Sequence, residues 1–307
     1  MRVAVVDIGT NTTRLLIADV DADGSVDERL RRSEVTRLGD GVDASGALSE
    51  QATARVFARL DEFALAIGEH ECEANLAVLT SAVRDASNGA EFAARVRDEY
   101  GLDARVLAGE EEAQLTFLGA MAGRAPAVEP TVVIDIGGGS TEVVVGVGRS
   151  AGFHTSLAAG VVRMSERHIH SDPPAPAELQ ELAGDVREVL AAGVPDAESA
   201  PVRAGIAVAG TATSAAAIEL ELPVYDSARV HGHHLSLGTV ELLLARLADM
   251  DEDGRRAVVG LQPGRAPTIV AGLVLLTEAM RAFKLERVEV SEHDILYGGA
   301  LRLAGLG

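Results

Sequence analysis

The sequence predicts an α/β fold with two domains, and three observations lead to this prediction. The chain has 307 residues, and a length of that order suits two domains of roughly 100–200 residues, each with its own core. Short apolar runs alternate along the chain with stretches of helical periodicity, a pattern typical of α/β proteins. An apolar run that ends in Asp-Ile-Gly occurs twice, at residues 5–9 and 133–137. The recurrence indicates a duplicated unit.

The first half of the chain is expected to begin with a β-hairpin. Two β runs, residues 3–6 and 15–20, flank a turn of Gly, Thr and Asn, and this arrangement is typical of paired antiparallel strands. A third strand is expected over 26–36, and Ser49 is positioned to cap a helix with apolar residues at helical spacing. The elements expected next are a strand at 76–79, a helix at 91–100, a strand at 104–107 and a helix at 110–121.

The segment 122–130 holds one glycine and two prolines and is predicted to be the domain boundary, which gives domains 1–123 and 131–292. After it the opening pattern returns with a shift of 128 positions, which aligns Asp7 with Asp135 and Gly9 with Gly137. Helices are expected near 176–192, 211–220, 239–249 and 266–283, followed by a strand at 287–290 and a short C-terminal helix.

Composition excludes several classes of function. The chain has 27 Lys and Arg against 47 Asp and Glu, a net charge of −20, so no nucleic-acid partner is expected. Lys284 is the only lysine, and it follows Phe283 and not a glycine. The Gly-Lys-Ser/Thr sequence of a P-loop is therefore absent, which excludes P-loop phosphoryl transfer. The longest apolar stretch, 266–280, is too short for a membrane span, so no membrane partner is expected. The lone Cys72 fits a reducing compartment, which predicts a cytoplasmic protein.

Two glycine-rich loops are candidate phosphate-binding sites. Glycine allows successive backbone N–H groups to point into one concavity, and hydroxyls add donors. An ordinary tight turn is the alternative for each loop, but each loop follows a strand that ends in Asp, which favours phosphate binding. A strand–turn–helix sequence at Gly210 and Thr211 is a third possible anion site. The loop residues are Gly9, Thr10, Asn11 and Thr12 in the first half, and Gly137, Gly138, Gly139, Ser140 and Thr141 in the second.

The aspartates that precede these loops are candidate metal ligands. A carboxylate beside a polyphosphate is electrostatically unfavourable unless a cation lies between them. Mg²⁺ suits such a site because it binds through one or two carboxylates together with phosphate oxygens. Asp135 and Glu142 form the better candidate pair, and Asp7 is the weaker candidate because a turn-capping role explains it equally well.

Two further groups are candidates for chemistry. Glu110, Glu111 and Glu112 open a helix, where acidic residues usually reflect the helix dipole. One of the three could instead be a general base for water, and the spacing does not say which. Arg84 follows a short buried strand; it is either an exposed surface residue or a guanidinium that faces phosphate.

Four motifs in this order identify a family resemblance. They lie at residues 5–12, 80–84, 108–113 and 133–142. Together they resemble the exopolyphosphatase / guanosine pentaphosphate phosphatase family of the actin-like ATPase superfamily. The resemblance implies two actin-like (RNase H-like) domains with an active site in the interdomain cleft. It also implies that the final residues, 293–307, return to the first domain.

The resemblance also implies roles for individual residues. The family's catalytic glutamate falls on Glu112, its second essential glutamate on Glu142, its arginine on Arg84 and its metal-associated aspartate on Asp135. The cofactor implied is Mg²⁺, or Mn²⁺, and a homodimer is possible. The sequence departs from many relatives at residues 12–14 and lacks an Arg in the segment 291–298.

The expected activity is hydrolysis of the terminal phosphate of inorganic polyphosphate. Removal of the 5′-phosphate of guanosine pentaphosphate is the nearest alternative, and an actin-like ATPase or kinase is a more distant one. A nucleotide-binding protein without turnover is a third. The chain resembles the short, two-domain branch of the family, and Arg84, helped by Arg14 and Arg163, is the main cation expected near substrate. Short polyphosphate chains are therefore the expected preference.

Overall fold

The computed structural model describes residues 1–124, 127–148 and 150–306. Two positions of the predicted boundary segment, 125 and 126, lie outside these ranges, as do 149 and 307. The chain divides into two compact units. Unit 1 comprises residues 1–125 and 293–307, and unit 2 comprises residues 126–292. Both chain ends therefore belong to unit 1.

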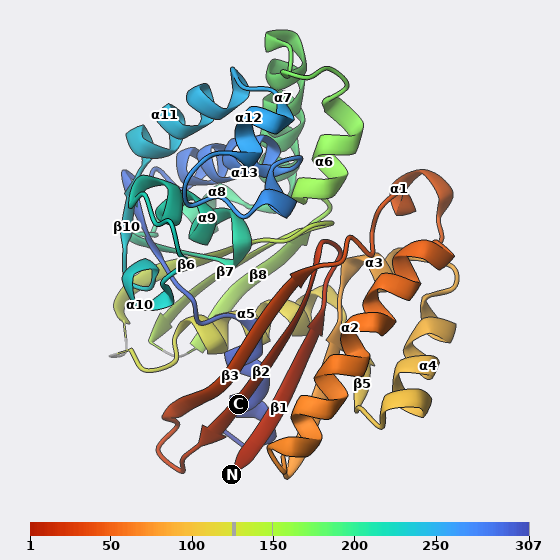
Figure 1. The fold of residues 1–307 in the computed structure, drawn as a ribbon. Coiled ribbons are helices and arrows are strands. Elements are labelled where there is room, and N and C mark those ends of the chain that lie inside the picture. Colours follow the sequence, from red (N-terminus) through yellow and green to blue (C-terminus); the bar gives the residue numbers. More distant parts are fainter. Residues whose placement is uncertain (125–126, 149, 307) are drawn as a thin grey trace. The chain divides into compact units, whose positions relative to one another are not determined.

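Unit 1 is a mixed sheet with the strand order β3-β2-β1-β4-β5 (Figure 1). The predicted hairpin is confirmed, because β1 and β2 pair antiparallel, and β4 and β5 continue the sheet in parallel with β1. Ser49 caps α2 as expected, since its side chain accepts from the Ala52 N–H. The elements are β1 (Arg2–Ile8), β2 (Thr12–Val20), β3 (Val26–Val35), α1 (Val42–Ser45), α2 (Glu50–Glu69), β4 (Ala74–Leu79), α3 (Ser81–Asp85), α4 (Gly89–Tyr100), β5 (Ala104–Val106), α5 (Gly109–Ala120) and α14 (Ile295–Leu303).

Alternate residues of β1 face the two sides of the unit 1 sheet. Ala4, Val6 and Ile8 join the core that α2 and α4 cover, whereas Val3 and Val5 pack with residues of α14. Asp7 has the parity of Val3 and Val5, because side chains alternate along a strand. Its carboxylate therefore lies on the α14 side of the sheet.

Unit 2 repeats the same sheet order and adds one strand at its edge: β10-β11-β9-β6-β7-β8. At the level of sheet topology, the predicted duplication is confirmed. The elements are β6 (Ala127–Ile136), β7 (Thr141–Gly148), β8 (Ser150–Leu157), α6 (Val161–His168), α7 (Pro176–Gly193), α8 (Asp196–Ser199), β9 (Ala204–Val208), α9 (Ala209–Glu219), α10 (Ser227–Val230), β10 (His234–Ser236), α11 (Leu237–Ala248), α12 (Glu252–Arg256), a 3₁₀ turn (Pro263–Arg265), α13 (Ile269–Ala282) and β11 (Arg287–Val290).

The structure differs from the sequence prediction at the boundary segment and in several elements. The predicted boundary segment 122–130 overlaps β6, which already begins at Ala127. Pro130 is accommodated there because the register with β7 is irregular between Ala127 and Thr131, and strands admit proline at bulges. The strand β8 and the helix α6 have no counterpart among the predicted elements. No described helix has the length and apolarity needed to cross a membrane.

Helices α5 and α14 approach each other so closely that only glycine fits between them. A Cβ on Gly119 would lie 1.8 Å from the Asp294 carbonyl oxygen, and one on Gly298 would lie 1.9 Å from the Leu115 carbonyl oxygen. Backbone therefore packs on backbone, and the returning C-terminal helix fixes the position of α5. This matters because α5 carries the three candidate glutamates in its first turn.

A buried ion cluster ties α14 to the unit 1 sheet. The Arg14 guanidinium donates to the Asp7 carboxylate from Nε and Nη2, at 2.9 and 2.6 Å, and its Nη1 donates to Asp294. Asp294 also caps α14 by accepting from the Leu296 N–H. One arginine on β2 thus contacts a carboxylate on β1 and the carboxylate that caps the returning helix α14.

The pKa values of the two carboxyl groups in the cluster are shifted in opposite directions. Burial raises the pKa of Asp7, although Arg14 acts against this rise. Burial also pushes the pKa of Asp294 upward, but Arg14 and Arg31 outweigh it, so that the pKa of Asp294 is lowered. Asp294 is therefore the carboxylate whose ionised form the fold stabilises.

We predict that Asp294→Asn lowers the free energy of unfolding by about 3–5 kcal/mol at pH 7, because it leaves Arg14 with one carboxylate for two contacts in a buried site. Asparagine can still cap α14, so the substitution removes the negative charge and keeps the cap. A carboxyl with a lowered pKa stabilises the fold above its unfolded pKa, about 3.9. That stabilisation is lost as the pH falls through the folded pKa. The gap between wild type and variant should therefore shrink below about pH 4.

Urea unfolding measured across this pH range checks the prediction. Glu99→Gln is the control, because it breaks an exposed ion pair of Arg95 with Glu99 four residues on, at 2.9 Å, which is worth about 0.3–0.5 kcal/mol. Equal losses in the two variants would contradict a stabilising role for the buried cluster.

Candidate active site

The candidate residues of unit 1 gather at one edge of its sheet. Strands β1, β4 and β5 run parallel, so their carboxyl ends meet at the edge where α/β proteins bind ligands. The loop 9–12, the start of α3 and the start of α5 follow these three strands. The hydroxyls of Thr10 and Ser81 share a hydrogen bond of 2.9 Å, which joins the first loop to α3.

Arg84 on α3 contacts Glu112 on α5. The Arg84 Nη1 donates to Glu112 Oε2 at 2.8 Å and to the Leu107 carbonyl at 2.9 Å. Glu112 is 7% exposed, whereas Glu110 and Glu111 are exposed. Glu111 instead lies 3.5 Å from the Ala108 N–H, where it serves the start of the helix. The structure therefore brings Glu112, and neither of its neighbours, to Arg84.

The two glycine-rich loops close with the same hydrogen bond. The Gly9 N–H donates to the Thr12 carbonyl at 3.0 Å, and the Gly137 N–H donates to the Ser140 carbonyl at 3.0 Å. In each loop this bond encloses two residues, 10 and 11 in the first loop and 138 and 139 in the second. The motif duplication seen in the sequence is therefore also a duplication of backbone geometry.

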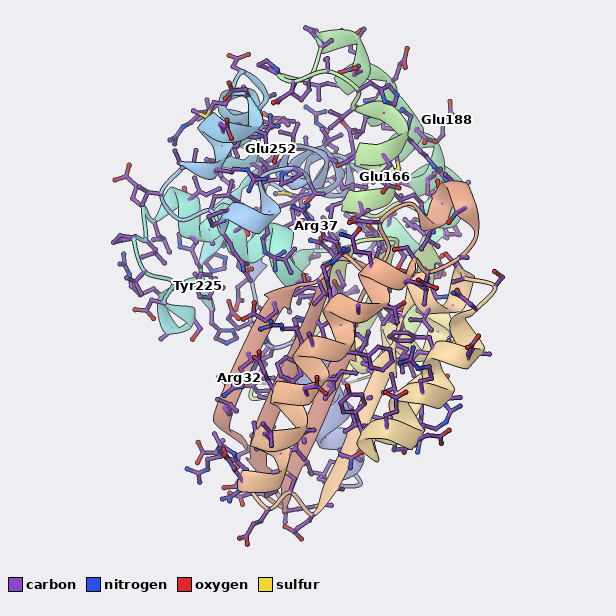
Figure 2. The ribbon with its side chains drawn as sticks, turned by 45° about the vertical axis from the view of Figure 1, so that its right-hand side comes forward. Arg32, Arg37, Glu166, Glu188, Tyr225 and Glu252 are labelled. Carbon is purple, nitrogen blue, oxygen red and sulfur yellow. The ribbon has the colours of Figure 1, made fainter. Side chains whose placement is uncertain are left out.

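In unit 1 the segment 36–39 holds the first loop from one side. The Asn11 carbonyl accepts from the N–H groups of Thr36 and Arg37, and the Thr10 carbonyl accepts from the Gly39 N–H. Arg37, labelled in Figure 2, has a φ of 50°, a strained value for a residue with a side chain. In a trans peptide the N–H points opposite to the carbonyl, so the loop's N–H groups point away from this segment.

In unit 2 the start of α6 plays the same part. The carbonyls of Gly137 and Gly138 accept from the N–H groups of the first α6 residues, at 2.9 and 2.8 Å, and the Gly139 carbonyl accepts from Arg163 Nε at 2.9 Å. A Cβ on Gly160 would lie 2.4 Å from the Gly138 backbone. Three successive N–H groups, of residues 138–140, therefore point away from α6 and form a nest of the kind that binds phosphate.

Thr141 contributes to this loop indirectly. Its hydroxyl donates to the Ala159 carbonyl at 2.5 Å, which ties β7 to the chain just before α6. The corresponding Thr13 shares a hydrogen bond of 2.8 Å with Thr36 in unit 1. Because the Thr141 hydroxyl already donates to this carbonyl, it does not donate to phosphate in this arrangement. A contact of Thr141 with phosphate stays a prediction.

Asp135 and Glu142 lie directly opposite each other in the β6–β7 register. Their side chains share one face of the sheet, and Cβ atoms of such pairs lie about 4.5–5.5 Å apart. Asp135 is 8% exposed and Glu142 is 2% exposed. Two like charges in this position destabilise a sheet, so the pair suits a bound cation.

The register reveals equivalent rows of four residues in the two units. Asp7 and Asp135 occupy the same place, but the residue opposite is Arg14 in unit 1 and Glu142 in unit 2. Arg14 supplies Asp7 with a positive charge from within the protein. The unit 2 row instead carries two acidic residues side by side. Asp7 as a metal ligand stays a prediction, one that must compete with its ion pair. The rows are Val78, Asp7, Arg14 and Ser33 in unit 1, and Val208, Asp135, Glu142 and Ser156 in unit 2.

Arg265 is a candidate that the sequence reasoning missed. A Cβ on Gly210 would lie 1.6 Å from Arg265 Nη1, so the guanidinium lies against the backbone at the start of α9. The predicted anion site at Gly210 and Thr211 thereby has a cationic neighbour from a segment more than fifty positions later in the chain. The hydroxyl side of Thr211 packs near Gly272 on α13. No local pattern around Arg265 indicates this contact.

The carboxylates of Asp135 and Glu142 suit Mg²⁺, which shares its ligands between protein, substrate and water, better than a metal ion whose ligands all come from the protein. Within the described residues, no group of three or more His, Cys, Asp or Glu side chains is arranged to hold a metal ion. Mg²⁺ usually binds through one or two carboxylates and completes its shell with substrate phosphate and water. The facing carboxylates of Asp135 and Glu142 are such a set.

Comparison with known proteins places this geometry in a family. The sequence profile described as the Ppx/GppA phosphatase family matches residues 16–302. The chain belongs to the Ppx/GppA phosphatase family. A relative named exopolyphosphatase 2, from Mycobacterium tuberculosis, is 37% identical and covers 99% of both chains.

Solved structures agree with this assignment. A crystal structure of an exopolyphosphatase-like protein matches with a TM-score of 0.92 at 34% identity, over 98% of this chain and 97% of the other. The Aquifex aeolicus member of the Ppx/GppA family matches with a TM-score of 0.83 at 30% identity, over 100% and 99%. The predicted α/β class is confirmed, and each of the two units is built on one mixed sheet. The roles of the individual site residues stay predictions.

Proposed function

We propose that this protein is an exopolyphosphatase that removes the terminal phosphate of inorganic polyphosphate with the help of Mg²⁺. The observation that carries the proposal is the facing pair of buried carboxylates, Asp135 and Glu142, beside a loop whose N–H groups point to one side. The name of the M. tuberculosis relative supports the activity. Glu112 and Arg84, which belong to unit 1, are proposed to supply a base and a cation.

Glu112 is the proposed general base. Its carboxylate orients a water molecule, accepts a proton from it and directs the water oxygen at the terminal phosphorus, and the bridging P–O bond then breaks. The shortened polyphosphate leaves as an anion, so no strong general acid is needed. Positioning and charge stabilisation therefore account for most of the rate.

Arg84 is proposed to act on both the base and the substrate. A guanidinium has five N–H donors in a fixed plane. Arg84 can hold Glu112 through Nη1 and donate to a phosphate oxygen through its other nitrogen atoms. The N–H groups of the two loops are proposed to hold further phosphate oxygens, and the start of α9 with Arg265 provides another anion site.

Asp135 and Glu142 are the residues proposed to hold Mg²⁺. Bound there, the ion would neutralise negative charge on the phosphate oxygens. The remaining contributions come from the chain itself: the loops bind, Arg84 orients, and Glu112 moves a proton. The expectation of a homodimer stays a prediction.

Replacement of Glu112 tests the assignment of the base. We predict that Glu112→Gln lowers kcat at least about 10²-fold while substrate still binds, because amide and carboxylate have the same shape but only the carboxylate accepts the proton. The matched control is Glu111→Gln, one residue away in an exposed position at the helix start, and its effect should be mild. Phosphate release measures both. Similar losses in the two variants would show that the neighbouring glutamate is equally involved.

A substrate panel tests the activity itself. We expect phosphate release to be fastest from short polyphosphate and slower from long polyphosphate, guanosine pentaphosphate and ATP, measured in parallel. Because a protein of charge −20 repels a long polyanion, moderate salt should raise kcat/KM on long chains. Faster release from guanosine pentaphosphate would replace the proposed substrate by the nucleotide. Processive shortening of long chains that weakens with salt would contradict the short-chain preference.

Metal removal tests the proposed cofactor. We expect activity to disappear after exhaustive EDTA treatment and to return with Mg²⁺ or Mn²⁺. Asp135→Asn and Glu142→Gln should raise the Mg²⁺ concentration needed for half-maximal rate, because each removes one anionic ligand. Glu99→Gln, which removes an exposed carboxylate on α4, is the control and should leave the Mg²⁺ requirement unchanged. Full activity in EDTA would refute the metal requirement.

A further inference from the structure

We propose that Ser156 is a positioning residue that fixes the orientation of the Glu142 carboxylate for cation binding. The inference rests on the proposed function, because it assigns a purpose to Glu142 at that site. Ser156 lies on β8 directly opposite Glu142 on β7. Its hydroxyl donates to Glu142 Oε1 at 2.8 Å. The sequence motifs gave no indication of this serine, which lies 14 residues after its partner.

The hydrogen bond restrains a side chain that would otherwise have several orientations. A glutamate has three side-chain torsions, and the last of them is broad. With Oε1 held from β8, the orientations open to the carboxylate are restricted. Partners of this kind, one step removed from a metal, orient its ligands, and their loss typically costs 10–100-fold in metal affinity or activity.

A serine orients the carboxylate without neutralising it. In the unit 1 row, Arg14 brings a positive charge to Asp7, and such a charge beside Glu142 would compete with a cation. The Ser156 hydroxyl satisfies a buried acceptor but is itself neutral. Ser156 therefore adds no positive charge that would compete with a divalent cation at Asp135 and Glu142.

The duplicated sheet provides a matched control. Ser33 occupies the place of Ser156 in the unit 1 row, opposite Arg14. A guanidinium has no acceptor, so a serine there cannot orient it by donating a hydrogen bond. Ser33→Ala and Ser156→Ala therefore remove the same atom from equivalent strands, one without and one with a carboxylate to position.

Binding of Mn²⁺ and turnover of short polyphosphate together test the proposal. For Ser156→Ala, we expect Mn²⁺ affinity, measured by electron paramagnetic resonance on the full chain with inorganic phosphate, to fall about 10–100-fold. We expect kcat at fixed Mg²⁺ to fall as well, while KM for polyphosphate changes little. Ser156→Thr keeps the hydroxyl on a residue that strands favour and should restore both quantities. Ser33→Ala should match the wild type.

The possible outcomes separate this proposal from the proposed function. Unchanged Mn²⁺ binding and turnover in Ser156→Ala would overturn the role of Ser156 while leaving the function intact. A loss that is accompanied by a lower Tm and is not rescued by threonine would also overturn it, because it would show a structural role. If Glu142→Gln itself retains full activity and metal binding, the proposed function fails at Glu142.

Discussion

The organisation of the molecule depends on one position in each sheet, the residue opposite the aspartate that ends the central strand. Chain topology places Asp7 and Asp135 identically, on the first strand of each unit and just before a glycine-rich turn. An aspartate buried there needs a counter-charge, because an isolated buried carboxylate is costly. Arg14 supplies it in unit 1. In unit 2 the residue opposite is Glu142, which adds a second negative charge. The same backbone thus builds an internal ion pair once and, once, the acidic pair that we propose binds a cation.

The internal ion pair in unit 1 also serves the candidate base. Arg14 extends from Asp7 to Asp294, so the start of the returning helix α14 is fixed to the sheet. Gly119 and Gly298 then allow α14 to pack backbone to backbone on α5. Because Glu112 stands in the first turn of α5, its place relative to Arg84 follows from this chain of contacts. The last part of the sequence therefore sets the position of a residue in the middle of it.

Local patterns made most of the fold and the loops predictable. Strand ends, the hairpin turns and the Ser49 cap depend on residues a few positions apart, and the 128-residue repeat marks both halves. The contacts that complete the site are long-range. Arg14 meets Asp294 across 280 positions, and Arg265 reaches Gly210 only because the fold brings the two segments together. Ser156 is closer in sequence, but its function depends on a register that no motif specifies. The spacing left the choice among three adjacent glutamates open; the family resemblance implied Glu112, and in the structure burial separates Glu112 from Glu111.

The charge distribution links the proposed divalent cation to the proposed preference for short substrates. Arg84 holds Glu112, Arg14 holds two aspartates, and Arg163 donates to a loop carbonyl. These arginines orient protein groups, so their charge is already partly balanced, within a chain of net charge −20. A terminal phosphate brings several negative charges to this environment. Each Mg²⁺ contributes two positive charges, and its attraction to phosphate falls off over about 8–10 Å at moderate salt. If the proposed ion binds there, its compensation would be local to the first few phosphates, and a longer polyanion would gain repulsion with each added phosphate but no matching attraction.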